Sequence, residues 1–132
     1  MCNSGNNLLQ EIIGAKIESI ASAENTYVGI KPESLLNTVS TSLIFDRGRL
    51  EIENPFTVLI SGRCVDSRNE SITDTLMTFV GCKVVEASIS SEEIGLDFEG
   101  DKSIRISLRE EDWNGPEAGH YAPKDGAIIV FD

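Results

Sequence analysis

The chain has 132 residues, 40% hydrophobic and 25% charged, a balance typical of one globular domain with its own core. Its 22 Asp and Glu outnumber 11 Lys and Arg, and the net charge of −11 disfavours direct binding to DNA or RNA. No apolar run approaches the roughly 18 residues of a membrane span, no secretory signal is evident, and three cysteines without metal-ligand spacing suit reduced thiols. We therefore expect a single domain, residues 1–132, in the cytoplasm, without nucleic-acid or membrane contact.

Two stretches of the chain are nearly the same. Residues 12–20 have the sequence IIGAKIESI, and residues 79–87 have the sequence FVGCKVVEA. Apolar residues at helical spacing precede each stretch and continue into its first two residues. Gly14 and Gly81 then stand where a helix would end in a left-handed residue, which glycine adopts without a steric clash. Each copy is therefore expected to be a helix, a glycine turn and a strand.

The similarity continues beyond these stretches. Each copy reaches a second segment with strand character, residues 27–30 and residues 93–96, and both segments have glycine in third place. The repeat predicts two similar halves, about 6–66 and 71–132. The polar segment 67–71 between them is expected to be an exposed connection.

Residues 41–54 alternate between apolar and polar side chains, as in a β-hairpin. We expect Leu43 to lie opposite Ile52, with Arg47 and Gly48 as the two-residue turn. This hairpin would add two strands to the first half.

Residues 94–108 form the corresponding hairpin of the second half, with Phe98 opposite Ile104. The apolar run at 127–132 predicts a final strand in the interior of a sheet. Together these elements predict a mainly β (α+β) fold. We expect an antiparallel sandwich or open barrel with two short helices, built from two similar halves.

Acidic residues are concentrated between residues 86 and 117, which hold ten carboxylates and three bases. The expected register places Asp97 opposite Arg105 and Glu93 opposite Arg109, as exposed cross-strand pairs. The carboxylates without such a predicted partner are Glu92, Glu99, Asp101, Glu110, Glu111 and Asp112.

The sequence contains no recognised catalytic motif. His120 is the only histidine, and no pattern sets a nucleophile and an orienting acid beside it. The acidic run around Asp101 differs from a calcium loop, because Lys102 stands where such a loop needs glycine. We therefore expect neither an enzyme nor a bound metal or cofactor.

Residues 110–126, EEDWNGPEAGHYAPKDG, contain the only tryptophan and a strong turn signal. Trp113 would either plug one end of the fold, which we favour, or present its ring to a partner. Tyr121 could likewise be an aromatic contact, because acidic residues surround this segment: Glu110, Glu111, Asp112 and Glu117.

An acidic β protein with reduced thiols and no catalytic residues is similar in kind to the immunity proteins of bacterial toxin–immunity pairs. The EEDWNGPEA segment also resembles a W-x-G-P-E-A segment of small bacterial proteins, some of them beside contact-dependent growth inhibition toxins. The resemblance implies a cognate toxin as the partner. A nuclease toxin is the expected kind, because an acidic surface can occupy its basic cleft.

The unpaired acids, together with one aromatic residue of the acidic segment, are then the residues predicted to contact the partner. These are Glu92, Glu99, Asp101, Glu110, Glu111, Asp112, Glu117 and Tyr121. Two other functions stay open from the sequence. The chain could be a small-molecule-binding β module with a pocket between its halves, or an acidic subunit of a larger cytoplasmic complex.

Overall fold

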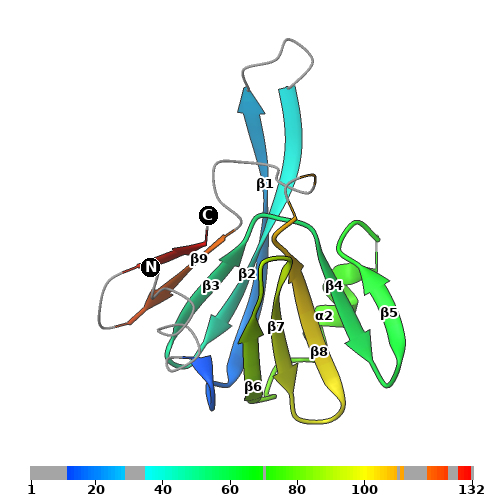
Figure 1. Ribbon diagram of the computed structural model, residues 1–132, viewed down its shortest axis with the longest axis vertical. Helices are drawn as coiled ribbons and strands as arrows, with labels where there is room; N and C mark the ends of the chain where they lie inside the picture. Colours follow the sequence, from blue (N-terminus) through cyan, green and yellow to red (C-terminus); the bar gives the residue numbers. More distant parts are fainter. Residues whose placement is uncertain are drawn as a thin grey trace.

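The computed structural model describes residues 12–28, 35–69, 71–109, 111, 119–124 and 128–131. These residues form ten strands, arranged as two five-stranded antiparallel sheets without closure into a barrel, and one short helix (Figure 1). The expected mainly β, antiparallel architecture is confirmed. The first of the two predicted helices lies almost wholly outside the described residues.

Sheet A has the strand order β1-β2-β3-β9-β10, and sheet B has the order β5-β4-β8-β7-β6. Sheet A consists of β1 (Ile17–Val28), β2 (Leu35–Phe45), β3 (Gly48–Ile52), β9 (Gly119–Pro123) and β10 (Ile129–Phe131). Sheet B consists of β4 (Phe56–Ile60), β5 (Arg63–Asp66), β6 (Val84–Ile89), β7 (Glu93–Phe98) and β8 (Lys102–Ser107). The helix α2 (Ile72–Met77) follows β5. Each sheet therefore joins three consecutive strands to a hairpin from a distant part of the chain.

One hydrophobic core contains side chains of both sheets, as in a β-sandwich. Its buried members include Ile17, Leu43, Phe45, Leu50, Ile52 and Tyr121 of sheet A, Phe56, Val58, Ile94, Leu96, Phe98, Ile104 and Ile106 of sheet B, and Leu76 of α2. Phe79, just after α2, meets Phe98 edge to face, with ring centroids 5.1 Å apart. Burying each large apolar side chain contributes about 1.5–3 kcal/mol, so the inward rows of the two sheets dominate the stability.

The two repeated stretches lie against each other and make the same backbone hydrogen bonds. The N–H of Gly14 donates to the C=O of Val84 at 2.8 Å, and the N–H of Gly81 donates to the C=O of Ile17, also at 2.8 Å. Donors and acceptors in the two bonds differ by the same 67 positions that separate the repeated sequences. Both glycines have positive φ, +87° and +90°, as a left-handed turn requires.

The residue pair between the two glycine turns also matches. Lys16 and Lys83 form an antiparallel bridge. The N–H of Lys16 donates to Oδ1 of Asp46 at 3.0 Å, and the N–H of Lys83 donates to Oε1 of Glu99 at 3.1 Å. Asp46 follows β2, the second strand of the hairpin β1–β2, and Glu99 follows β7, the second strand of the hairpin β6–β7. Each carboxylate therefore fixes the end of its hairpin to one of the repeated stretches.

The two predicted hairpins, β2–β3 and β7–β8, both differ by two residues from the predicted register. Leu43 lies opposite Leu50, and Leu96 lies opposite Ile104. The turn of the first hairpin begins one residue earlier than predicted. Since side chains alternate with a period of two, a shift of two residues leaves every side chain on its predicted face. The apolar pattern therefore gave the correct buried face and the wrong cross-strand partners.

Two predicted strands have other positions. Residues 27–28 belong to β1, which is one long strand, so residues 27–30 are not the counterpart of residues 93–96. By the register, residues 40–43 lie at the positions that correspond to residues 93–96. The final strand, β10, lies at the edge of sheet A rather than in its interior, because among the described residues it pairs with β9 alone.

Candidate interaction surface

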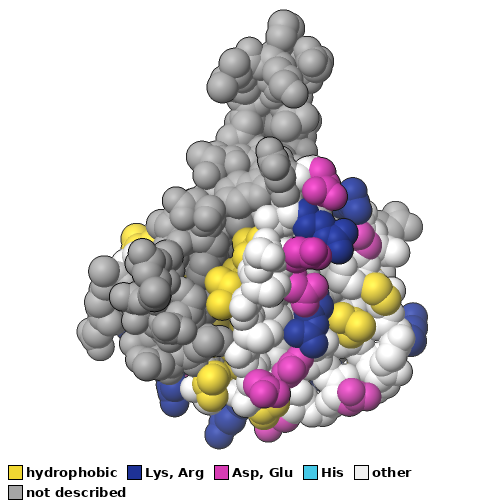
Figure 2. Space-filling view, in the orientation of Figure 1, with side chains coloured by type: hydrophobic (Ala, Val, Ile, Leu, Met, Phe, Trp, Pro, Cys, Tyr) yellow, Lys and Arg dark blue, Asp and Glu magenta, His cyan; other side chains and the backbone are white. Residues whose placement is uncertain are grey.

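The outer face of sheet B carries most of its charged side chains on β7 and β8. The apolar residues of these strands, Ile94, Leu96, Phe98, Ile104 and Ile106, are buried in the core, and the residues between them lie on the opposite face. The outward residues are Glu93, Gly95 and Asp97 on β7, and Ser103, Arg105 and Ser107 on β8. Figure 2 shows basic and acidic side chains alternating over these strands.

Two carboxylates hold the guanidinium of Arg105 at the centre of this face. Its Nη2 atom lies 3.0 Å from Oδ1 of Asp97, and its Nε atom lies 3.9 Å from Oε2 of Glu93. Gly95 lies directly opposite Arg105, and a Cβ there would collide with the guanidinium. The glycine therefore leaves the space that the arginine occupies. A glycine inside a strand pattern was the signal in the sequence for this close approach.

Two more arginine–carboxylate pairs flank this centre. Nη2 of Arg109 lies 3.4 Å from Oε2 of Glu92. Nε and Nη2 of Arg68 contact the two carboxylate oxygens of Asp66 at 3.0 and 3.1 Å. The Arg68 side chain, together with the Arg68 N–H at 2.8 Å, lowers the pKa of Asp66. All four side chains are substantially exposed, so the pairs position their groups more than they stabilise the fold.

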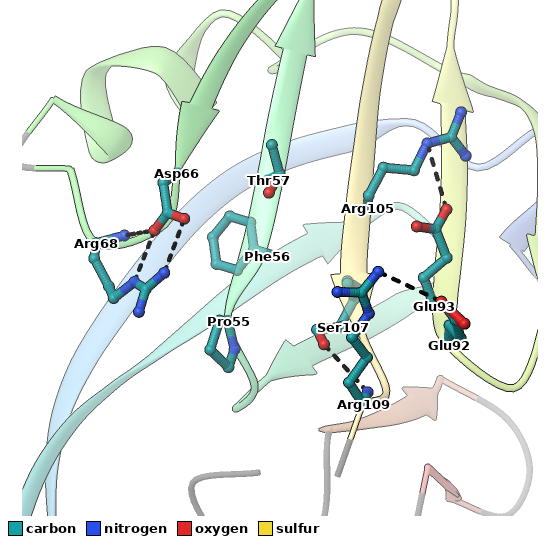
Figure 3. Close-up of a pocket in the computed structure, with 11 residues that line it drawn as sticks. Pro55, Phe56, Thr57, Asp66, Arg68, Glu92, Glu93, Arg105, Ser107 and Arg109 are labelled. Atoms are coloured by element: carbon teal, nitrogen blue, oxygen red, sulfur yellow. Dashed lines mark hydrogen bonds and ion pairs between the residues drawn. The ribbon is translucent and has the colours of Figure 1, made fainter. Parts of the chain in front are cut away.

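The three pairs line one groove of about 240 Å³ that runs from β5 across β4 and β8 to β7 (Figure 3). Pro55, Phe56 and Thr57 line the groove between its two charged sides. Its three arginines and three carboxylates balance in charge. Such a surface can form charge-assisted hydrogen bonds with a polar segment of a partner. The sequence prediction missed this groove because Arg68 and Asp66 are distant in the chain from β7 and β8.

The predicted contact carboxylates of sheet B lie at the two ends of β7. Glu92 precedes β7, while Glu99 and Asp101 lie in the turn after it, so the groups are roughly 20 Å apart along the strand. Two of them have partners that the sequence did not predict: Glu92 pairs with Arg109, and Glu99 accepts the N–H of Lys83. The structure thus divides what the sequence suggested was one acidic cluster.

The other predicted contacts fall in or near segments that the structure leaves undescribed. Glu111 is described and exposed. Glu110, Asp112, Glu117 and Trp113 lie outside the described residues. The described residues contain 14 of the 22 acids and ten of the 11 bases, a net charge of −4. Most of the excess negative charge therefore belongs to segments outside the two sheets as described.

The predicted contact role of Tyr121 is wrong. Its side chain is fully buried in the core, so it cannot touch a partner. Tyr121 lies in β9 opposite Leu50, and its hydroxyl oxygen would be 2.7 Å from a Cβ at Gly48. The turn signals upstream suggested a loop here, whereas β9 pairs with β3 along its whole length.

His120 lies on the outer face of sheet A in a row with Ser42 and Glu51. Nε2 of His120 is 3.2 Å from Oε2 of Glu51, and the Ser42 hydroxyl accepts a 2.9 Å hydrogen bond from Arg49. The register places Glu51 between Ser42 and His120. A serine nucleophile needs its histidine base adjacent to it, so this row does not have the order of a catalytic triad.

A hollow of about 380 Å³ lies beside α2, lined by Ile60 and Val65 together with polar side chains. Nζ of Lys102 donates to the C=O of Thr78 at 2.6 Å at its margin. This hollow differs from the pocket between two halves that a small-molecule-binding module was expected to have. Core side chains fill the space between the sheets.

No family model matches the chain, and neither the curated proteins nor the solved structures include one that is detectably similar to it. In the part of the chain that the structure describes, no three His, Cys, Asp or Glu side chains group closely enough to hold a metal ion. No helix in that part is long and apolar enough to cross a membrane.

Proposed function

We propose that the protein is a cytoplasmic immunity protein that binds a cognate toxin. The toxin would be a nuclease domain with a basic cleft, and the acidic surface of the protein would cover its active site. The protein would act by binding and not by catalysis. The observation that carries the proposal is the placement of exposed carboxylates at both ends of the β7–β8 hairpin.

Backbone hydrogen bonds hold these ends in place. The N–H of Leu108 donates to the C=O of Glu92 at 2.8 Å, and the N–H of Ser61 donates to the C=O of Asp101 at 3.0 Å. Carboxylates on such turns need little reordering on binding, which lowers the entropic cost of association. The net charge of −11 would raise the rate of encounter with a basic cleft.

The paired arginines between the two ends fit the same function. Arginine is enriched in the parts of interfaces that contribute most binding energy. Arg105 already has its guanidinium oriented by Asp97 and Glu93, so it could contact a partner without further ordering. The acids would then attract the partner, and the balanced groove would supply specific contacts.

The test assays the product of the adjacent reading frame for nuclease toxin activity, with and without the purified chain. We expect the purified chain to abolish its nuclease activity at one equivalent. Reversal of Glu99 and Asp101 to Lys should lower the association rate about tenfold, and reversal of Glu110, Glu111 and Asp112 should do the same. The matched control reverses Glu18 and Asp74, exposed acids on β1 and α2. Absence of inhibition, or equal slowing by the control, would contradict the proposal.

We also propose that the fold is built from two similar halves. Matching hydrogen bonds at Gly14 and Gly81 support this, as does an irregularity in pairing one residue beyond Ile17 in β1 and beyond Val84 in β6. The order of sheet A, β1-β2-β3-β9-β10, also parallels the order β6-β7-β8-β4-β5 of sheet B. Under this proposal each half contributes three strands to one sheet and a closing hairpin to the other.

An experimentally determined structure tests this second proposal. Superposition of residues 12–22, 41–45 and 48–52 on residues 79–89, 94–98 and 102–106 should align the glycine turn and three strands with Cα deviations of about 2 Å or less. Unrelated positions for the two glycine turns would remove the duplication.

A further inference from the structure

The hairpins β1–β2 and β6–β7 have the same beginning and different lengths. In the shorter hairpin, pairing ends at Ile89 opposite Ile94. The corresponding pair of the longer hairpin is Ser22 opposite Thr41, and pairing there continues to Val28 opposite Leu35. The shorter hairpin shows how much pairing the fold needs, so the additional part of β1–β2 is not required to build a sheet.

We call this additional part, residues 23–28 and 35–40, the arm. It extends beyond the other strands of both sheets (Figure 1). The pairing of β2 with β3 ends at Thr41, so no third described strand pairs with the arm. At about 3.3 Å per residue its six residue pairs span about 20 Å. A two-stranded ribbon without a third strand is marginally stable in water, and persistence of such a ribbon implies a use.

The composition of the arm is unlike that of a solvated ribbon. Glu24 is its only charged residue among twelve, whereas a quarter of the whole chain is charged. Near its far end, Tyr27 is paired with Leu36, and Val28 with Leu35. These two consecutive pairs consist of apolar residues only. Centres of protein interfaces are likewise depleted in charge and enriched in aromatic residues.

We infer that the arm is a docking element, which binds the toxin of the proposed function by strand addition or by insertion into its cleft. The arm offers two backbone edges that no described strand occupies, as strand addition requires. A second copy of the chain is a poorer occupant, because each copy carries a charge of −11 and the copies repel. A basic partner experiences attraction instead. The acidic body therefore steers the toxin, and the arm, with its single charge, holds it.

The inference rests on the proposed function, and the experiment separates the two. In the first variant, residues 24–39 are replaced by Asn-Gly, which closes Ala23 and Ser40 with a two-residue turn. In the second variant, Tyr27→Lys and Leu36→Glu place opposite charges across the ribbon and preserve its pairing. The control is Val85→Lys, which changes an exposed aliphatic residue on the shorter hairpin. Affinity for the toxin domain and the melting temperature are measured for all.

We expect both arm variants to lose about 30-fold or more in affinity, with melting temperatures within about 3 °C of the parent. The control should change neither quantity. Full affinity in both variants would overturn the inferred docking role of the arm and would not contradict the proposed function. Failure of the intact chain to bind the toxin would overturn both. A dimer of the intact chain that becomes monomeric without the arm would show that a second copy occupies it.

Discussion

The hairpins β1–β2 and β6–β7 make the same junction at a glycine turn and then diverge. Up to Ser22 and Thr41 the longer hairpin repeats the shorter one, and both supply inward side chains to the core. Beyond that point the two strands of β1–β2 pair with each other, and no other described strand pairs with them. The shared part of the hairpins is explained by packing. The pairing beyond that point is not explained by packing among the described residues, which is why we propose a binding role for it.

The largest expected effect tests the shared part. Phe45 on β2 and Phe98 on β7 occupy corresponding positions, and both are buried. Phe45→Ala and Phe98→Ala should each lower the free energy of unfolding by about 3–5 kcal/mol, because each leaves a cavity. Urea denaturation measures both losses. A loss below about 1 kcal/mol in one variant, together with the full expected loss in the other, would show that the two hairpins contribute differently to the core.

The glycine turns provide a smaller effect. Gly14→Ala and Gly81→Ala should each cost about 1 kcal/mol or more, because both residues have positive φ. The Cβ itself has room at Gly81, with no atom within 4 Å, so the cost there is conformational. Gly81→Asn is the matched control, since asparagine tolerates this conformation better. Equal stability of the alanine and glycine forms, measured by thermal unfolding, would contradict the left-handed turn.

The outer faces of the hairpins offer a still smaller effect. Gly95 on β7 corresponds by register to Ser42 on β2. The position of Ser42 accommodates a side chain, whereas a Cβ at Gly95 would collide with the guanidinium of Arg105. Gly95→Ala should displace the Arg105 guanidinium from Asp97 while costing less than about 1 kcal/mol, as expected for an exposed pair. Asp97→Asn removes the same pair without the collision. Loss of toxin affinity in both variants with unchanged stability would assign Arg105 to the interface.

The smallest effect concerns Asp66 and Arg68 at the groove. Arg68 lowers the pKa of Asp66 in the folded protein, so this pair contributes at pH values above the pKa of the unfolded chain. The contribution disappears as the pH falls through the lower, folded-state pKa. Arg68→Ala should raise the Asp66 pKa toward its ordinary value, as followed by NMR titration of the carboxyl carbon. An unchanged pKa would show that Arg68 does not hold the carboxylate in solution.

The buried faces could be predicted from the sequence because burial depends on a period of two. Leu43, Leu96 and Ile104 are all inside, as their pattern predicted. Their cross-strand partners could not be obtained in this way, since a shift of two residues leaves the pattern unchanged. The turns decide the register, and the first turn begins one residue earlier than its Gly48 suggested.

The candidate surface was predicted less well than the fold. Net charge counts residues without their neighbours, so it did not reveal that Glu92 pairs with Arg109 or that Glu99 binds a backbone N–H. Tyr121 lay in a segment with turn signals, and pairing with β3 overrode them. The groove depends on contacts between Arg68 on one side and Glu92 on the other, which sequence spacing does not encode.

The association rate with the toxin domain, measured at several salt concentrations, tests the account most directly. If an acidic surface seeks a basic cleft, the rate constant should fall about tenfold or more between about 20 mM and about 150 mM salt. The dissociation rate constant should change much less, because the arm has a single charge and its contacts depend little on salt. A rate constant that is indifferent to salt would contradict the claim that the negative charge of this protein serves to find its partner.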